Sequence, residues 1–235
     1  STDDETGNQI STVELGRAVR EIGGVDIYAS DACLMQMAEV AYELKDTAKI
    51  VIGSEDGEPG DSWAYDQFLA RVHSNKNNLT PEVMAATAVQ GFKAYYGAKN
   101  KPATLSAIHT SGISELKTML DQWAELAMLE DKKMVKEALR ASTGFIGVGS
   151  RDLIHFINNV QDKAASEELK ALTVTVTNHL LYKVIFDNAA IGDKFKQAYG
   201  LAVYLPAYGY TDSYEDLPWS REGKWDDFAK WITSK

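Results

Sequence analysis

The sequence predicts an α/β fold with a mostly parallel central sheet that is flanked by helices. Three observations lead to this expectation. β-rich runs over residues 25–29, 48–54 and 103–109 alternate with segments that have the apolar spacing of helices. The first two runs enclose one helical segment, which is the arrangement of a crossover between parallel strands. With 235 residues, 45% of them hydrophobic, the chain is long enough to bury a substantial core.

The elements follow in order from local signals. Ser11 and Glu14 have the spacing of a capping box that opens a helix, and Gly23 and Gly24 end it. Helical patterns cover residues 36–44, 82–96, 114–128, 131–141, 152–160 and 166–181, and further β-rich runs cover 182–187 and 200–206. We expect residues 1–149 to form the α/β core. Residues 150–235 are expected to be mainly helical and to return strands to that core.

The C-terminal tail, residues 219–232, carries Trp225, Phe228 and Trp231 at helical spacing. Such a stripe predicts a helix that docks on the core rather than a ligand site.

Composition excludes several classes of function. The net charge of −10 argues against a nucleic-acid partner and favours a basic substrate. No apolar run approaches the roughly 20 residues that span a bilayer. The one cysteine cannot form an internal disulfide, but it leaves a reactive thiol open.

That cysteine, Cys33, is the first candidate for chemistry. A free cysteine is often a small buried hydrophobe. Cys33 instead follows a predicted strand and stands beside Ser30 and Asp31, which favours a nucleophile that faces a cleft. A thiolate nucleophile usually needs a histidine base. His109, at the end of a predicted strand, is the candidate base within this chain. A hydrolase that uses Cys33 and His109 is therefore one hypothesis.

The other three histidines are expected to be structural or solvated. His155 and His179 fall in predicted helices, and His73 falls in a polar loop.

The acidic loop over residues 55–65 is the second candidate. It lacks the ordered ligand spacing of an EF-hand, and a solvated turn is the simple interpretation. Trp63 and Tyr65 next to Asp61 nevertheless indicate an aromatic-walled pocket with a carboxylate, which suits a Lys or Arg side chain. Motifs for metals, nucleotides and serine hydrolases are missing from the sequence.

Several segments together resemble the clostripain-like cysteine peptidases, which are relatives of caspases, gingipains and legumain. The resemblance covers nearly the whole chain and rests on residues 31–35, 39, 41–43, 54–60, 63–65 and 200–206, with Tyr214 and Trp225. It implies a caspase-like fold with a helical C-terminal subdomain. It also implies an endopeptidase that cleaves after Arg or Lys, with Cys33 as nucleophile and Asp31, Asp61 and Trp63 in the substrate pocket.

One departure from this family is large, because no His-Gly motif precedes Cys33. Members of the family are made as precursors and cut between His and Cys, and the acidic start at Ser1, without Met, looks like a heavy chain after such a cut. The resemblance thus implies a heterodimer with a light chain that carries the catalytic histidine, secreted by a bacterium or held on its surface. A catalytically inert module that binds basic peptides is the alternative from a different class.

The resemblance also raises calcium as a cofactor, since some members depend on it. No stretch of the sequence contains enough ordered oxygen ligands to name a calcium site, and no other cofactor or metal is indicated.

Overall fold

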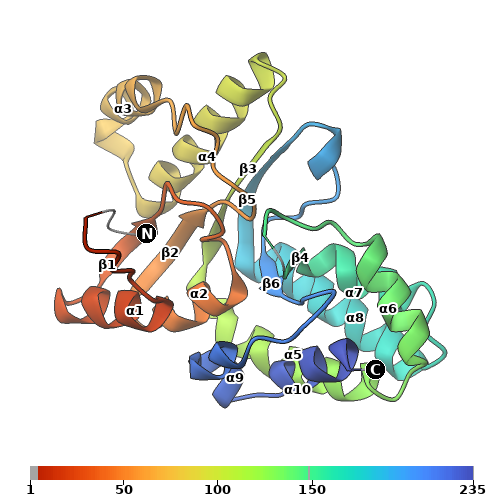
Figure 1. Cartoon of the computed structure of the whole chain (residues 1–235). Coiled ribbons are helices and arrows are strands. Elements are labelled where there is room, and N and C mark those ends of the chain that lie inside the picture. The colour runs from red at the N-terminus through yellow and green to blue at the C-terminus, as the bar shows by residue number, and fades with distance from the viewer. Residues whose placement is uncertain (1–4, 148, 235) are drawn as a thin grey trace.

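The computed structural model describes residues 5–147 and 149–234, and Ser1 therefore lies outside the described residues (Figure 1). Within them, the centre is a four-stranded sheet in the order β1-β2-β3-β5. Its strands are β1 Val25–Ala29, β2 Ala48–Gly53, β3 Ala103–His109 and β5 Ile185–Ile191. The three β-rich runs of the first half are all strands, as predicted.

The expectation of a mostly parallel sheet is wrong for these four strands. β1 and β2 are parallel, but β3 runs antiparallel to β2, and β5 antiparallel to β3. The reason is a helix that the sequence reading missed, α3 Tyr65–Ser74, which precedes α4 Pro81–Ala98. After α3, which packs on α4, and α4 itself, the chain is back at the end of the sheet where β2 stops, and β3 runs from there in the opposite direction.

Helices cover both faces of the sheet, as predicted. α3 and α4 lie on one face, in the upper part of Figure 1, where the core includes Ile50 and Ile52 of β2 with Phe92 of α4. Val51 points to the other face, where α1 Thr12–Glu21, α2 Ala38–Leu44 and α5 Ile113–Ala127 pack. The alternation along β2 is that of a strand buried on both faces.

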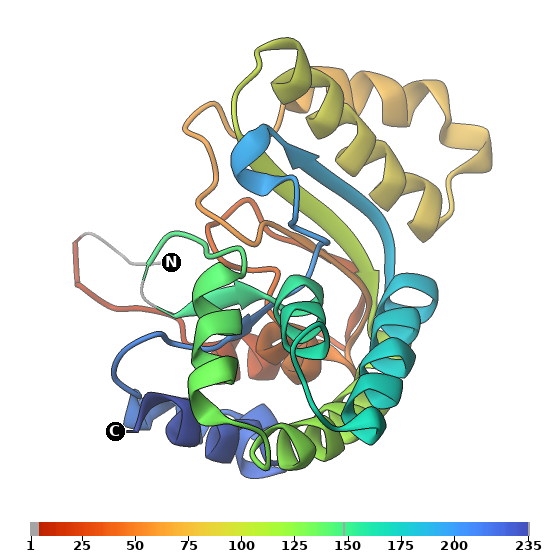
Figure 2. The same ribbon diagram turned by 90° about the vertical axis from the view of Figure 1, so that its right-hand side faces the viewer.

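The C-terminal part adds helices and a small second sheet. Figure 2 shows its helices grouped around the lower half of the molecule. A two-stranded antiparallel sheet of β4 Ser150–Asp152 and β6 Ala202–Tyr204 lies among them. Its helices are α7 Leu153–Gln161, α8 Glu167–His179, α9 Pro218–Arg221 and α10 Trp225–Thr233, and α6 Lys132–Ala141 of the preceding segment packs against α7. The short strand β4 was not predicted, since three residues leave no readable alternation.

Local signals placed the helix ends well. The Ser11 capping box is present, with Ser11 N–H donating to the Glu14 carboxylate at 2.8 Å. In the tail, Trp225 and Phe228 are fully buried and the Trp225 ring centroid lies 6.3 Å from that of Trp123 on α5. The prediction that this helix docks on the core is confirmed. No helix in the described part of the chain has the length and apolarity needed to cross a membrane.

Candidate active site

Cys33 lies on the turn that leaves the end of β1. The strand stays paired with β2 up to Ser30, whose N–H donates to the Ile52 carbonyl at 2.9 Å. Beyond the thiol, Leu34 N–H donates to the carbonyl of Asp56, in the loop after β2, at 3.1 Å. The turn is thus fastened to the carboxyl end of the neighbouring parallel strand, and the thiol is exposed to solvent.

Backbone strain is concentrated around this turn. In the described part of the chain, the non-glycine residues with positive φ are Leu34 at 61°, Ser62 at 58° and Asn100 at 50°. Leu34 directly follows Cys33, and Ser62 donates a hydrogen bond to Asp31. Such conformations cost about 1–3 kcal/mol each and persist where the surroundings enforce them. Two of the three, Leu34 and Ser62, thus lie next to Cys33 and Asp31.

The loop after β2 also touches the sulfur. Glu58 N–H donates to Cys33 Sγ at 3.2 Å. Gly57 lies against the thiol, since a Cβ at this position would be in van der Waals contact with Sγ at 3.9 Å. With the bond from Leu34 N–H to the Asp56 carbonyl, this contact joins the loop after β2 to the Cys33 turn at two points.

Asp31 lines a pocket two residues before the thiol. Tyr65 OH donates to Asp31 Oδ2 at 2.9 Å, and the Ser62 hydroxyl donates to the same oxygen. Burial, together with the Asp31 charge, raises the pKa of Tyr65, which keeps its hydroxyl protonated and able to donate. The pocket measures about 220 Å³ and lies between β1, α3 and α4. Its lining is Ile27, Ala29, Asp31, Ile52, Trp63, Tyr65, Phe68, Met84 and Ala88.

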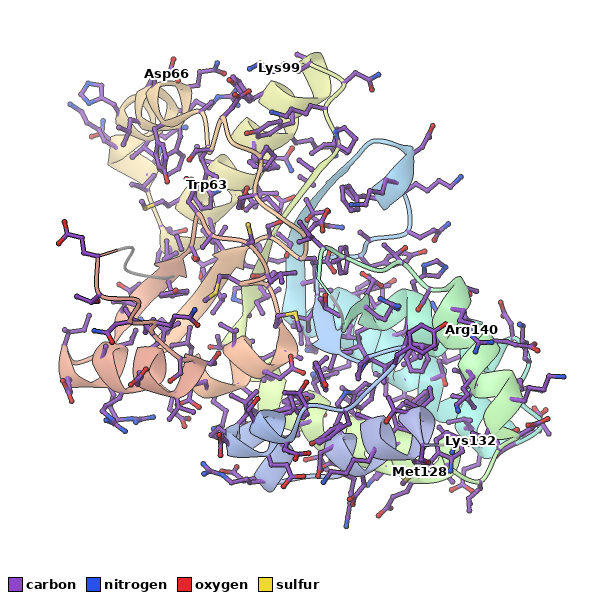
Figure 3. All side chains as sticks on the ribbon, in the orientation of Figure 1. Trp63, Asp66, Lys99, Met128, Lys132 and Arg140 are labelled. Atoms are coloured by element: carbon purple, nitrogen blue, oxygen red, sulfur yellow. The ribbon has the colours of Figure 1, made fainter. Side chains whose placement is uncertain are left out.

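Trp63 forms an aromatic wall of this pocket. It is buried, and its ring lies nearly parallel to that of Tyr65, with the centroids 6.1 Å apart. Figure 3 shows Trp63 between the central sheet and the upper helices. The structure therefore brings Asp31, Trp63 and Tyr65 together around one apolar space with a carboxylate at its edge.

Asp61 occupies a different position. It is half-exposed and pairs with Lys99 at 3.0 Å and Lys101 at 3.6 Å, and Lys99 lies at the top of Figure 3 near the end of α4. The hydrogen bond from Lys99, with the charge of Lys101, lowers the pKa of Asp61. Asp61 is not among the residues that line the Asp31 pocket.

Glu58 is a residue that the sequence analysis missed. Trp63 Nε1–H points at its Oε1 from 3.4 Å, and Oε2 is buried without a partner in the described part of the chain. Burial raises the pKa of Glu58 to about 8, and the Asp31 charge adds to the rise against the Trp63 hydrogen bond. A glutamate beside Pro59 looks like a solvated loop residue in the sequence, and its burial depends on the fold.

The Cys33–His109 pairing is wrong. Because β3 is antiparallel to β2, His109 pairs with Ile50, near the start of β2, whereas Gly53 at the other end of β2 pairs with Ser106. His109 therefore lies at the opposite edge of the sheet from Cys33, where its ring packs on Phe186.

The other histidines have partners elsewhere. Thr143 N–H donates to His155 Nδ1 at 3.0 Å, and His179 Nε2 lies 2.8 Å from the Gly112 carbonyl. His73 is exposed on α3, in a helix rather than in the predicted loop. No histidine of residues 5–147 and 149–234 is hydrogen-bonded to Cys33.

Metal ligation finds no support in the side chains that are described. Among residues 5–147 and 149–234, no three His, Cys, Asp or Glu side chains are grouped so that they could hold a metal ion. The arrangement instead offers an exposed thiol, a backbone N–H beside it and an acidic, aromatic-walled pocket. An exposed thiol with a backbone N–H beside it has the chemistry of a nucleophilic site.

Known proteins share this architecture. A clostripain from Bacteroides thetaiotaomicron, solved with the peptide inhibitor BTN-VLTK-AOMK, is 16% identical with a TM-score of 0.71, covering 94% of this chain and 97% of that one. A secreted C11 cysteine protease from the same organism, bound to an irreversible peptide inhibitor, is 16% identical with a TM-score of 0.68. The match covers 97% of this chain and 67% of that one. An inactive zymogen of a C11 protease from Parabacteroides distasonis is 17% identical with a TM-score of 0.63. The match covers 89% of this chain and 61% of the zymogen chain.

No curated protein sequence matches the chain. At these identities the solved structures establish the caspase-like fold of the C11 proteases. The family model of the clostripain family, in contrast, matches residues 1–231, which is almost the full length. The chain therefore belongs to the clostripain family of cysteine proteases, which are hydrolases of peptide bonds.

Proposed function

We propose that this chain supplies the nucleophile and the specificity pocket of an endopeptidase that cleaves after Arg or Lys. The observation that carries the proposal is the pocket of Asp31, Trp63 and Tyr65 beside the exposed Cys33. A long cationic side chain would pack its methylene stem on the rings and place its charge at the carboxylate. The peptide inhibitor of the Bacteroides thetaiotaomicron clostripain has Lys as the last residue of its VLTK sequence, which agrees with this specificity.

Asp31, rather than Asp61, binds the substrate cation in this proposal. Asp31 lines the pocket, whereas Asp61 is already paired with Lys99 and Lys101. The net charge of −10 draws basic substrates toward the site in either case.

The general base is a histidine on a separate light chain. Strand β1, which leads to Cys33, is an edge strand of the described sheet and is paired on one side only. Its residues are half-buried or exposed, whereas those of β2 are mostly buried. An open strand edge is a template for another strand, and a strand added there would end beside Cys33.

Two of the solved relatives contain segments beyond the part they share with this chain. This chain covers 61% of the zymogen from Parabacteroides distasonis and 67% of the secreted protease, whereas it covers 97% of the clostripain chain solved with BTN-VLTK-AOMK. We infer that a precursor of this protein is cut to give the two chains of a heterodimer.

The reaction then follows from the groups at hand. The Cys33 thiolate attacks the carbonyl carbon after the basic residue, and the carbonyl oxygen becomes an oxyanion. Cys33 N–H, which donates to no acceptor in the described residues, is placed to bind that oxygen. The protonated histidine gives its proton to the leaving amine as the C–N bond breaks. Water activated by the same histidine hydrolyses the thioester and releases the thiolate.

Cys33→Ala in the two-chain peptidase tests this function. Cleavage of Arg and Lys reporter peptides should disappear while binding of the peptides remains. Cleavage at the wild-type rate by the variant would overturn the role of Cys33. A wild-type protein that binds basic peptides but does not cleave them, and whose thiol resists an arginyl chloromethyl ketone, would instead identify an inert binding module.

Location is proposed from one neighbour. A solved C11 protease from Bacteroides thetaiotaomicron is described as secreted, and we infer secretion or display at the surface of a bacterium for this protein too. Fractionation of the source cells, with detection of the chain in the medium or on the surface, tests this. Detection only inside the cells would contradict it.

A further inference from the structure

Two carboxyl groups lie completely buried beneath the Cys33 turn. Glu55 follows β2 in the same loop as Glu58 and is 1% exposed. Asp152 ends β4, caps α7 and is 0% exposed. The two carboxyl groups are held side by side, because Asp152 accepts from Tyr199 N–H at 2.6 Å and Glu55 accepts from the next N–H along the chain, that of Gly200, at 3.1 Å. Two adjacent buried carboxylates repel each other, so we assign one shared proton to the pair.

The neighbours decide which carboxyl holds that proton. Both oxygens of Asp152 accept backbone hydrogen bonds, from His155 N–H at 2.7 Å and from Tyr199 N–H at 2.6 Å. Glu55 Oε2 accepts from Gly200 N–H at 3.1 Å, but Glu55 Oε1 accepts from no donor in the described residues. The donors stabilise a negative charge on Asp152 and leave Glu55 Oε1 as the atom that bears the proton.

The surrounding charges leave this assignment unchanged. Lys194 is bound to Asp56 at 2.8 Å, and that aspartate also accepts from Ile146 N–H. Tyr199 OH donates to Gln197 at 2.7 Å, and burial followed by the Asp152 charge raises the pKa of Tyr199, so this hydroxyl stays neutral. Burial lowers the pKa of His155, whose ring is bonded to Thr143. No cation in the described residues is paired with either carboxyl, and burial followed by the Asp152 charge raises the pKa of Glu55 well above its usual range.

We propose that Glu55 is a positioning residue whose proton, donated to Asp152, holds the loop that places the Cys33 thiol. The loop reaches the nucleophile at two points, through the Asp56 carbonyl that accepts from Leu34 N–H and through Glu58 N–H that donates to Sγ. At its other end it is held through Glu55 to Gly200, through Asp56 to Lys194 and Ile146, and through Ser54 and Asp56 N–H to the Thr104 hydroxyl. This inference rests on the proposed role of Cys33 as nucleophile.

Loss of the proton would act on both stability and catalysis. Two adjacent buried negative charges repel strongly, and among the described residues only Gly200 N–H donates to Glu55. We expect the loop to loosen and the Glu58 N–H contact to Sγ to be lost. The peptidase should therefore lose activity at alkaline pH for a reason that is separate from titration of the thiol or of the histidine.

Glu55→Gln and Asp152→Asn give opposite results under this proposal. A glutamine keeps an oxygen for Gly200 N–H and presents an NH₂ donor to Asp152 without needing a proton. An asparagine at position 152 would turn its own NH₂ toward the N–H of His155 or Tyr199. Glu55→Gln should fold stably, whereas Asp152→Asn should be destabilised at every pH. Equal tolerance of both variants would overturn the assignment of the proton.

Stability against pH is the first readout, and it does not depend on catalysis. The pKa of Glu55 is raised by folding, so its stabilising effect is complete below the unfolded pKa and is lost as pH rises toward the folded pKa. The unfolding constant of the wild-type chain, relative to Glu55→Gln, should rise by up to about tenfold per pH unit above about pH 4.3. Parallel curves for the two proteins would contradict a shared proton.

The pH profile of kcat/KM is the second readout, measured on the two-chain peptidase with a Lys reporter. Glu55→Gln should move the alkaline limb to higher pH and should keep, near neutral pH, activity that Glu55→Ala loses. An unmoved alkaline limb would overturn the positioning role. Complete retention of activity in Cys33→Ala would instead refute the proposed function, while the stability result would stand.

Glu39→Gln is the matched control. Glu39 is also buried with a raised pKa, but it accepts from Tyr214 OH and Tyr204 N–H rather than from a carboxyl. Its replacement should change stability with pH without moving the alkaline limb of activity. A shift of the limb equal to that of Glu55→Gln would show that any buried carboxyl has this effect, which would contradict the proposal.

Discussion

The two ends of the central sheet differ in how their charged side chains are arranged. At the carboxyl end of β1 and β2, an exposed thiol stands beside a pocket of about 220 Å³, with Asp31 oriented by two hydroxyl donors. The opposite end holds a larger cavity of about 810 Å³, which His109 lines. Charged residues of both signs line that cavity: Arg20, Asp26, Lys45, Asp46, Lys49 and Glu82.

Under the proposed function, the chemistry takes place at the smaller of the two cavities, so cavity size alone does not identify the site. Lys49 and Asp26 pair at 2.6 Å in the larger cavity, but their side chains are 77% and 61% exposed, so water weakens the pair. The smaller site combines a strained turn with carboxyl groups that are oriented or buried. Oriented and desolvated groups are the ones that bind and react selectively.

The largest expected contrast is between Cys33→Ala and His109→Ala in the two-chain peptidase. Removal of the nucleophile should lower kcat/KM by a thousandfold or more, roughly as for other nucleophile deletions. His109 lies at the opposite end of the sheet, so its removal should leave the rate nearly unchanged. Reporter assays on the two variants measure this, and a comparable loss in both would mean that the two ends of the sheet act together.

The second contrast is between Asp31→Asn and Asp61→Asn. Loss of the charged partner of a substrate cation costs about 2 kcal/mol, which is roughly a 30-fold loss in kcat/KM on Arg and Lys substrates. Asp61→Asn should cost less, because that carboxylate is paired with Lys99 and Lys101. A panel with neutral residues at the cleaved position is the control. Equal losses on neutral and basic substrates would indicate misfolding rather than lost specificity.

Glu58 provides a third test, of stability against pH. Its pKa is raised to about 8 in the folded chain, so the stability it contributes is present below about pH 4.3 and declines as pH rises toward 8. Between these values, the free energy of unfolding of the wild type should fall relative to Glu58→Gln by up to about 1.4 kcal/mol per pH unit. Urea titrations at several pH values measure the gap, and a gap that stays constant would mean that Glu58 is solvated.

The smallest effect is expected at the other end of the sheet. Asp26→Asn breaks the exposed pair with Lys49 and should change the free energy of unfolding by less than about 0.5 kcal/mol. The difference should shrink further in high salt. A larger or salt-independent change, measured by the same urea titration, would show that the Asp26–Lys49 pair contributes more to stability than its exposure indicates.

Local signals predicted a good part of the fold. The first three strands, the Ser11 capping box, the position of Cys33 at a strand-to-helix turn and the docked tail helix all follow from short-range patterns. The direction of β3 did not, because α3 has no buried residue and so lacks a strong apolar stripe. Because α3 was not predicted, β3 was expected to run parallel to β2, and His109 was therefore expected at the same edge of the sheet as Cys33.

The positions of the proposed site residues were predictable where neighbours in sequence are neighbours in space. Asp31 and Cys33 share one turn, and Trp63 lies near Tyr65. The pairing of Asp61 with Lys99 and Lys101 joins segments about 40 positions apart, so no local sequence pattern predicts it. The same holds for Glu55, which looks like a solvated loop residue until the fold buries it against Asp152.

Selective labelling tests the central claim most directly, namely that Cys33 is the nucleophile of a site completed by a histidine from another chain. An arginyl chloromethyl ketone is added to the chain alone and to the chain with its light chain, and the labelled residue is located by peptide mass mapping. Iodoacetamide serves as the control for simple exposure of the thiol. We predict one adduct, on Cys33, that forms far faster with the light chain present. Labelling at the same rate in its absence, or at His109, would contradict the account.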